Sequence, residues 1–212
     1  MIVAYTGVPG TGKSLHAAND VRFALNRKHP RPVLANFELA KDAPVRHPEK
    51  FTYCPNEDMT VQYLIDYATD FWSRRKTFRE NYLLLVLDEV QLWHNSRTWR
   101  DASRLDYLKF FSQHRKLGYK IILIAQSTKM IDNQFRMEIE YEVNHRRISS
   151  MGPIGDLLAM PFGGRMFLAV EYLYQTNERV GRTVFVARKA DMRMYDTRAT
   201  FPLLAGEKLL TV

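Results

Sequence analysis

The stretch Gly7-Val8-Pro9-Gly10-Thr11-Gly12-Lys13-Ser14 decides the fold of this 212-residue chain. It has the pattern of a phosphate-binding loop, in which Gly, any four residues and Gly-Lys-Ser/Thr follow one another. Glycines here let consecutive backbone N–H groups turn inward around a phosphate, where a Cβ would clash. The flanks fit the motif, because Ile2–Tyr5 has the pattern of a buried strand and Leu15–Leu25 that of a helix.

The polar residues of the loop have expected partners in bound Mg²⁺–ATP. Lys13 would place its charge between the β- and γ-phosphates, and Ser14 would give its hydroxyl to Mg²⁺. The helix that begins here would offer its positive end to the phosphates. We therefore predict that the nucleotide is bound by Gly7, Pro9, Gly10, Thr11, Gly12, Lys13 and Ser14. The alternative is a Gly-rich turn that matches by chance.

A second motif ends the apolar run Leu83–Leu87 with Asp88 and Glu89. A strand with apolar residues on both faces belongs in the middle of a parallel sheet, and such sheets bind ligands at the carboxyl ends of their strands. We predict that Asp88 holds Mg²⁺ through a water and that Glu89 orients and deprotonates the attacking water. An acidic strand end that faces solvent is the alternative.

A third polar residue, Gln126, ends another buried run, Tyr119–Ala125. If this strand lies beside the Asp-Glu strand, Gln126 comes close to the γ-phosphate and could sense its presence. The alternative is a glutamine that caps a turn.

The remaining patterns predict an α/β fold, with a mainly parallel sheet between helices and antiparallel strands added after residue 140. We predict helices over Lys13–Asn26, Met59–Arg79, Ala102–Leu117 and Ile131–Glu138, and further strands over Val33–Phe37, Arg165–Tyr174 and Arg182–Arg188. Tyr141–Ile148 alternates like an edge strand, and the Gly/Pro-rich stretch Met151–Gly164 is expected to be a loop. We expect one domain over residues 1–200 and a short tail over 201–212.

Composition narrows the class of protein. Hydrophobic content of 46% and charged content of 25% are those of an ordinary globular protein. The single cysteine, Cys54, rules out an internal disulfide framework. The longest apolar runs are far shorter than the ~18 residues that a membrane span needs, so we expect a soluble chain.

The net charge of +8 is uneven along the chain. Residues 1–90 hold 12 Lys/Arg and 11 Asp/Glu, a net of +1, and residues 91–212 hold 19 and 12, a net of +7. A nucleic acid or an anionic membrane face could bind this basic half, with Arg146 and Arg147 as candidate DNA contacts. A solvated surface is the alternative.

Taken together, the motifs resemble those of the zonular occludens toxin (Zot) family, which includes the gene I assembly proteins of filamentous bacteriophages. The resemblance covers residues 1 to about 198. It is carried, in order, by the phosphate loop, Leu87-Asp88-Glu89-Val90-Gln91, His114-Arg115-Lys116 with Gly118, Ala125-Gln126, Ile131-Asp132 with Phe135-Arg136, and Tyr195-Asp196-Thr197.

This resemblance implies an additional-strand P-loop ATPase, related to the FtsK/HerA pumps, that uses ATP and Mg²⁺ to drive filamentous phage assembly and extrusion. The resemblance implies that the protein acts at the cytoplasmic face of the host inner membrane. The implied partners are further copies in a homo-oligomeric ring such as a hexamer, phage assembly and exit proteins, and single-stranded DNA. Membrane association is implied by the resemblance alone, because the membrane span usual in the family has no counterpart here.

In related pumps an arginine reaches the γ-phosphate of the neighbouring subunit. By position, Arg115 is the first candidate and Arg136 the second, and a surface or salt-bridged arginine is the alternative for each. Two other functions stay open at this point. One is a nucleotide-switched assembly scaffold with little hydrolysis, and the other is a double-stranded DNA packaging or conjugation pump.

Overall fold

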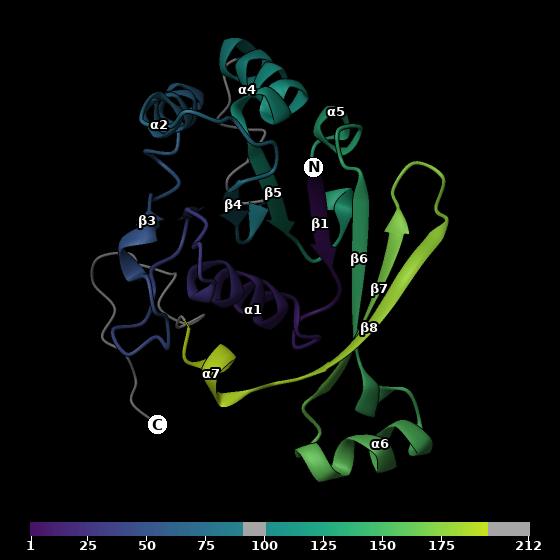
Figure 1. Ribbon diagram of the computed structural model, residues 1–212. Coiled ribbons are helices and arrows are strands. Elements are labelled where there is room, and N and C mark those ends of the chain that lie inside the picture. Colours follow the sequence, from purple (N-terminus) through teal and green to yellow (C-terminus); the bar gives the residue numbers. More distant parts are fainter. Residues whose placement is uncertain (91–100, 195–212) are drawn as a thin grey trace, which may run out of the picture.

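The computed structural model describes residues 1–90 and 101–194, without the side chains of residues 101–104. The described residues form an eight-stranded sheet in the order β3-β2-β4-β5-β1-β6-β7-β8 (Figure 1). The strands are β1 Ile2–Thr6, β2 Val33–Ala35, β3 Phe51–Tyr53, β4 Leu83–Leu87, β5 Tyr119–Ile124, β6 Tyr141–Arg147, β7 Met166–Leu173 and β8 Arg179–Val186.

Six of these strands, β3 to β6 in spatial order, run parallel, while β7 and β8 continue the sheet in antiparallel fashion. Strand β5 lies between the loop strand β1 and the acidic strand β4 and pairs with both. The predicted fold class is therefore confirmed: an α/β P-loop fold with an inserted strand and an antiparallel extension near the C-terminus.

Helices cover both faces of the parallel part. The helices are α1 Lys13–Asn26, α2 Val61–Ser73, α4 Asp101–Gln113, α5 Asn133–Arg136, α6 Pro153–Ala159 and α7 Lys189–Met192. Because side chains alternate along a strand, Leu83, Leu85 and Leu87 pack towards α2, α4 and α5, while Leu84 and Val86 pack towards α1. Within the described residues, no helix is both long enough and apolar enough to cross a bilayer.

Several sequence predictions need correction. Strand β6 is not an edge strand, since it pairs with β1 on one side and β7 on the other. Its residues Val143 and His145 are buried towards α1, while Arg146 and Arg147 at the end of the strand are exposed.

The predicted loop Met151–Gly164 contains α6 and the 3₁₀ turn Met160–Phe162, because Pro153 stands at the first helical turn, where proline is tolerated. Helix α2 ends at Ser73, before Arg79, where the apolar face gives way to a basic run. Helix α5 is likewise shorter than predicted, beginning after the cap residue Asp132. The predicted tail 201–212, residues 91–100 and Tyr195–Thr197 lie outside the described residues.

Candidate nucleotide site

The phosphate loop joins the end of β1 to the start of α1, and two of its glycines are required by close contacts. Gly7 and Gly12 have φ angles of 140° and 92°. A Cβ on Gly7 would lie 2.5 Å from the carbonyl oxygen of His145, and a Cβ on Gly12 would lie 2.8 Å from the ring of Phe167. Strand β6 and the first extension strand, β7, therefore contact the loop directly, which no sequence pattern indicated.

The side chain of Lys13 folds back onto the phosphate loop. Its Nζ donates hydrogen bonds to the carbonyl oxygens of Gly7 at 2.7 Å and Val8 at 3.1 Å. Burial lowers the pKa of Lys13, while the charges of Glu89 and Asp88 raise it. The ammonium group thus bonds to the loop and is within electrostatic range of both carboxylates, and a phosphate oxygen could replace either carbonyl as its acceptor.

Asp88 and Glu89 end β4 at the carboxyl edge of the sheet. The side-chain amide of Asn36 holds the Asp88 backbone on both sides: Nδ2 donates to the Asp88 carbonyl at 2.8 Å, and Oδ1 accepts from the Asp88 N–H at 2.7 Å. Glu89 has a φ of 48°, a left-handed conformation that is uncommon for a side chain of this size. Sequence analysis missed Asn36, although its place just after a buried strand beside β4 was a usable signal.

A cavity of about 500 Å³ brings four of the predicted polar residues together, whereas Asp88 and Thr11 are not among its lining residues. Its lining includes Lys13, Ser14, Glu89 and Gln126, and the carbonyl of Gln126 accepts a hydrogen bond from Gly7 N–H at 3.2 Å. The order β4-β5-β1 explains this meeting, because all three strands end at the same edge. A hydroxyl from Ser14 and carboxylate oxygen from Asp88 are ligands suited to Mg²⁺, which retains several waters and phosphate oxygens.

The same cavity is bounded on its other side by the sheet extension. On the loop side the lining also includes Pro9, Gly10, Gly12 and Leu15. On the other side it consists of Arg147, Arg165, Phe167, Ala187 and Met192. Arg147 thus lines the nucleotide cavity, although the sequence suggested it for DNA. Arg165 was not singled out at all.

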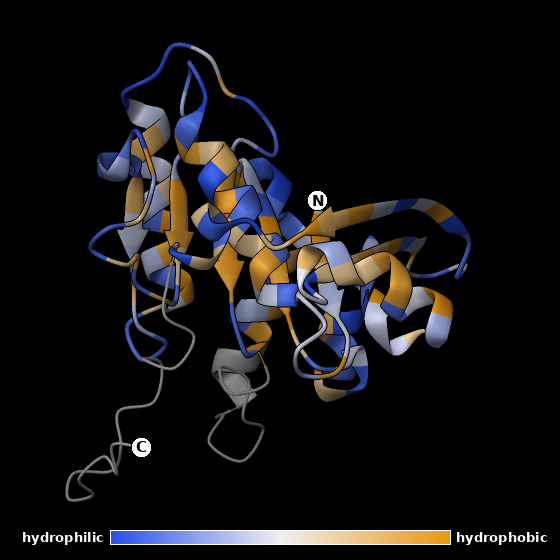
Figure 2. Ribbon diagram, turned by 90° about the horizontal axis from the view of Figure 1, so that it is seen from below, coloured by the Kyte–Doolittle hydropathy of each residue, from blue (hydrophilic) through white to orange (hydrophobic). Residues whose placement is uncertain are grey.

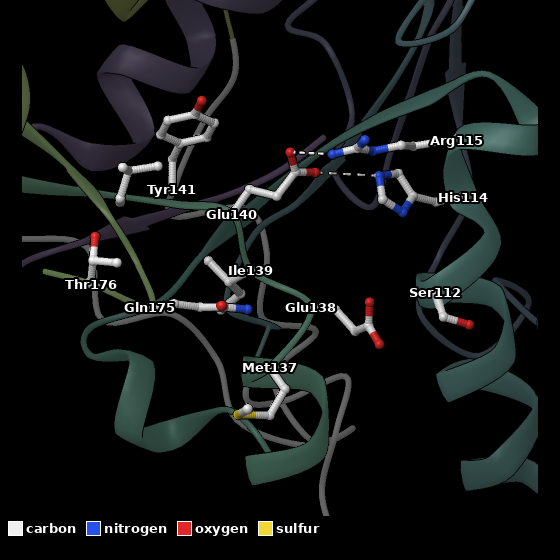
Figure 3. Close-up of a pocket in the computed structure, with 11 residues that line it drawn as sticks. Ser112, His114, Arg115, Met137, Glu138, Ile139, Glu140, Tyr141, Gln175 and Thr176 are labelled. Carbon is white, nitrogen blue, oxygen red and sulfur yellow. Dashed lines mark hydrogen bonds and ion pairs between the residues drawn. The ribbon is translucent and has the colours of Figure 1, made fainter. Parts of the chain in front are cut away.

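Neither candidate trans arginine lines this cavity. Arg115 lies in a second cavity of about 550 Å³, at the opposite end of β6, where it forms an ion pair of 2.5 Å with Glu140 (Figure 3). His114 lies beside them with its Nε2 3.9 Å from Glu140, and burial lowers the pKa of His114 to about 4. Arg136 donates to Asn133 at 2.8 Å from α5. Either arginine could therefore serve a nucleotide only in another subunit.

A pair of histidines, His145 buried and His16 half-buried, lies next to the loop. His16 Nδ1 lies 2.9 Å from His145 Nε2, and the ring of His16 stacks on Tyr5 at 4.8 Å. The Tyr5 hydroxyl donates to Asp20 at 2.6 Å. Burial lowers the pKa of both histidines, to about 3 for His145. The pair is neutral at physiological pH and joins α1 to β6.

Comparisons with known proteins agree with this geometry. A profile of the family described as "Zonular occludens toxin (Zot)" matches residues 1–199. "Gene 1 protein" of Escherichia phage If1 is 30% identical over 181 residues, which are 80% of this chain and 46% of that protein. "Gene 1 protein" of Salmonella phage IKe is 41% identical over 86 residues, or 39% of this chain and 24% of that protein. The chain spans less than half the length of these relatives.

Solved structures extend the likeness at the level of the fold. The N-terminal domain of zonular occludens toxin from Neisseria meningitidis superposes with a TM-score of 0.54 at 17% identity, covering 92% of this chain and 98% of that one. The DNA-packaging ATPase from Sulfolobus Turreted Icosahedral Virus also gives a TM-score of 0.54, at 12% identity, covering 86% of this chain and 95% of that one. These two likenesses concern the fold, whereas the family profile runs through the loop, the acidic strand and the antiparallel extension alike. The chain therefore belongs to the zonular occludens toxin (Zot) family.

Proposed function

We propose that this chain binds Mg²⁺–ATP in the loop cavity and hydrolyses it to drive the assembly and extrusion of filamentous phage through the host inner membrane. The observation that carries the proposal is the shared cavity lined by Lys13, Ser14, Glu89 and Gln126. The gene 1 proteins of filamentous phages supply the biological setting.

Each residue of the site has a role that follows from its chemistry. Lys13 and the loop amides bind the β- and γ-phosphates, and Ser14 and Asp88 hold Mg²⁺, which neutralises charge that develops on the phosphates. Glu89 accepts a proton from the attacking water. Gln126 follows β5, the strand between the loop and the acidic motif, and there it responds to the γ-phosphate.

The working form is a homo-oligomeric ring at the cytoplasmic face of the inner membrane, acting with phage exit proteins on single-stranded DNA. A ring is supported by the position of Arg115, which lies away from the nucleotide cavity of its own chain. In a neighbouring subunit such an arginine can stabilise the transition state of phosphoryl transfer.

The proposal is tested by measuring ATP turnover for wild type, Lys13→Ala and Glu89→Gln at several protein concentrations. We expect Lys13→Ala to lose nucleotide binding, and Glu89→Gln to bind ATP while its turnover falls by about two orders of magnitude or more. Equal turnover in all three proteins would refute the proposal that this site hydrolyses ATP. A change in oligomer mass on adding ATP, without turnover, would instead favour a nucleotide-switched scaffold.

A further inference from the structure

We infer that Arg147 and Arg165 form a second cationic wall of the nucleotide site, supplied by the same chain, that binds the phosphates of a nucleoside triphosphate opposite the loop. This inference rests on the proposed function, since it concerns the same ligand. It assigns a binding role to the antiparallel extension, which neither the loop motif nor the acidic motif contains.

The first argument is position. Arg147 ends β6, and Arg165 directly precedes β7. Both line the cavity that also contains Lys13 and Ser14. In the β6–β7 pairing, Arg147 stands opposite Phe167, and residues directly opposite share one face of a sheet. Phe167 in turn packs against Gly12, so this face is the one turned to the loop.

The second argument is charge. The charged side chains in the lining are Lys13, Arg147 and Arg165 against Glu89 alone, which gives a net charge of +2. Among the side chains that the structure describes, those of residues 1–90 and 105–194, no carboxylate forms an ion pair with Arg147 or Arg165. Asp88, the proposed Mg²⁺ ligand, adds one negative charge beside this lining, so the site is still net positive and attracts the negatively charged Mg²⁺–ATP.

The third argument is that both arginines are held in place. Arg147 Nε donates to the carbonyl of Gly164 at 2.9 Å. Arg165 is fixed through its backbone, since its carbonyl accepts from Ala187 N–H at 3.0 Å, and its Nη1 lies 3.9 Å from Met192 Sδ. Arg147 thereby keeps its two terminal nitrogens, and Arg165 most of its guanidinium, for phosphate oxygens, which guanidinium groups bind in bidentate fashion.

The chain offers a matched control in Arg146. It is the neighbour of Arg147 on β6 and is also exposed, but it points to the opposite face and does not line the cavity. Arg146→Ala removes the same charge from almost the same place. A general effect of net charge would therefore change both variants equally.

The experiment measures the dissociation constants of Mg²⁺–ATP and of inorganic tripolyphosphate by calorimetry, using the full chain. We expect Arg147→Ala and Arg165→Ala each to weaken both ligands about tenfold or more, and Arg165→Lys to lie between Arg165→Ala and wild type. Arg146→Ala should bind both ligands as wild type does. Thermal unfolding of each variant shows that it is folded.

Three results would overturn the inference. These are unchanged binding in the two cavity variants, an equal loss in Arg146→Ala, and a loss for ATP without a loss for tripolyphosphate, which would place the arginines on the ribose or base. The failure of the proposed function looks different: wild type would then bind no ATP, or Lys13→Ala would bind it equally well.

Discussion

At the scale of single residues, the buried side-chain amide of Asn36 fixes the backbone of Asp88. Asn36 is 7% exposed. Its side-chain amide bonds to both the N–H and the carbonyl of Asp88, as the backbone of a neighbouring strand would. Its Nδ2 also donates to Asn56 at 2.9 Å. Because Glu89 follows Asp88 directly, Asn36 sets the position of both carboxylates and acts as a positioning residue.

The variant Asn36→Ala should therefore lower kcat of ATP hydrolysis about tenfold or more while the Kd of ATP changes by less than about threefold. Two backbone groups lose their partner, so the free energy of unfolding should fall by about 1–3 kcal/mol. The control is Asn56→Ala, which removes one acceptor of Asn36 but leaves the clamp on Asp88. An equal loss of kcat in Asn56→Ala, or a parallel loss of ATP affinity in Asn36→Ala, would contradict the positioning role.

At the scale of elements, the loop is shaped by β7 as well as by its own sequence. Gly10 and Gly12 both have positive φ angles, of 78° and 92°, so an alanine is strained at either place. A Cβ on Gly10 meets nothing within 4 Å, whereas a Cβ on Gly12 meets Phe167. The pair separates backbone strain from the contact with the sheet extension.

Gly12→Ala should accordingly destabilise the protein by about 1–3 kcal/mol more than Gly10→Ala, because overpacking against an aromatic ring is added to the strain. Urea unfolding of the two variants gives this difference. The double variant Gly12→Ala/Phe167→Leu should recover part of it, since the smaller side chain leaves room. If the two single variants have equal stabilities, β7 does not constrain the loop.

The sequence was sufficient for the parts of this fold whose signal is local. Leu83–Leu87 and Tyr119–Ala125 are apolar on both faces, and that pattern placed Glu89 and Gln126 at one edge of a parallel sheet. Strand β6 was harder to place, because its exposed end residues suggest an edge strand although it lies inside the sheet, between β1 and β7. Arg165 is near in sequence only to a Gly/Pro-rich stretch, so its arrival in the nucleotide cavity depends on tertiary packing.

At the scale of the whole molecule, two buried histidines link stability to pH. Burial lowers the pKa of His145 to about 3 and that of His114 to about 4, whereas an unfolded histidine titrates near about 6.5. Between these values the unfolded chain binds more protons than the folded chain. The stabilising contribution is therefore complete above about pH 6.5 and is lost as the pH falls towards the folded pKa values.

Urea unfolding between pH 7.5 and pH 5 should show this loss, with a limiting slope of about 1.4 kcal/mol per pH unit for each histidine. His145→Gln should be less stable at pH 7.5, because His16 and Thr6 lose a buried partner, but its stability should depend less on pH. The exposed His29→Gln is the control. An unchanged slope in His145→Gln would show that this group does not couple stability to pH.

The molecule carries an apolar surface at the end of β6 that lies opposite the Arg115 cavity. Helix α6 and its flanks project beyond the sheet (Figure 1), and hydrophobic residues, coloured orange in Figure 2, recur along the ribbon there. The apolar side chains, between 45% and 75% exposed, are Met151, Ile154, Leu157, Leu158, Met160 and Phe162. We call this surface the α6 surface.

We propose that the α6 surface binds the Arg115 cavity of a second copy of the chain. The lining of that cavity includes the apolar residues Met137, which is 63% exposed, and Leu173. The α6 surface and the Arg115 cavity lie at opposite ends of β6, so a contact between them joins subunits head to tail. Such a contact generates a ring when the rotation from one subunit to the next closes after a whole number of subunits. Arg147 lines the nucleotide cavity and donates to the carbonyl of Gly164, two residues after Phe162 of the α6 surface. The contact would therefore bring Arg115 of one subunit towards the nucleotide of the next.

Leu157→Glu and Met137→Glu test the two faces of this contact separately by sedimentation velocity in the presence of ATP. Each variant alone should lose the oligomer and the concentration dependence of turnover, while its affinity for ATP stays within about threefold of wild type. Val180→Glu, at an exposed apolar position on β8, should assemble normally. An equimolar mixture of Leu157→Glu and Met137→Glu should form dimers but no larger species, because one subunit keeps the cavity and the other keeps the α6 surface. A symmetric contact between two α6 surfaces predicts the opposite for the single variants: Met137→Glu would then associate on its own.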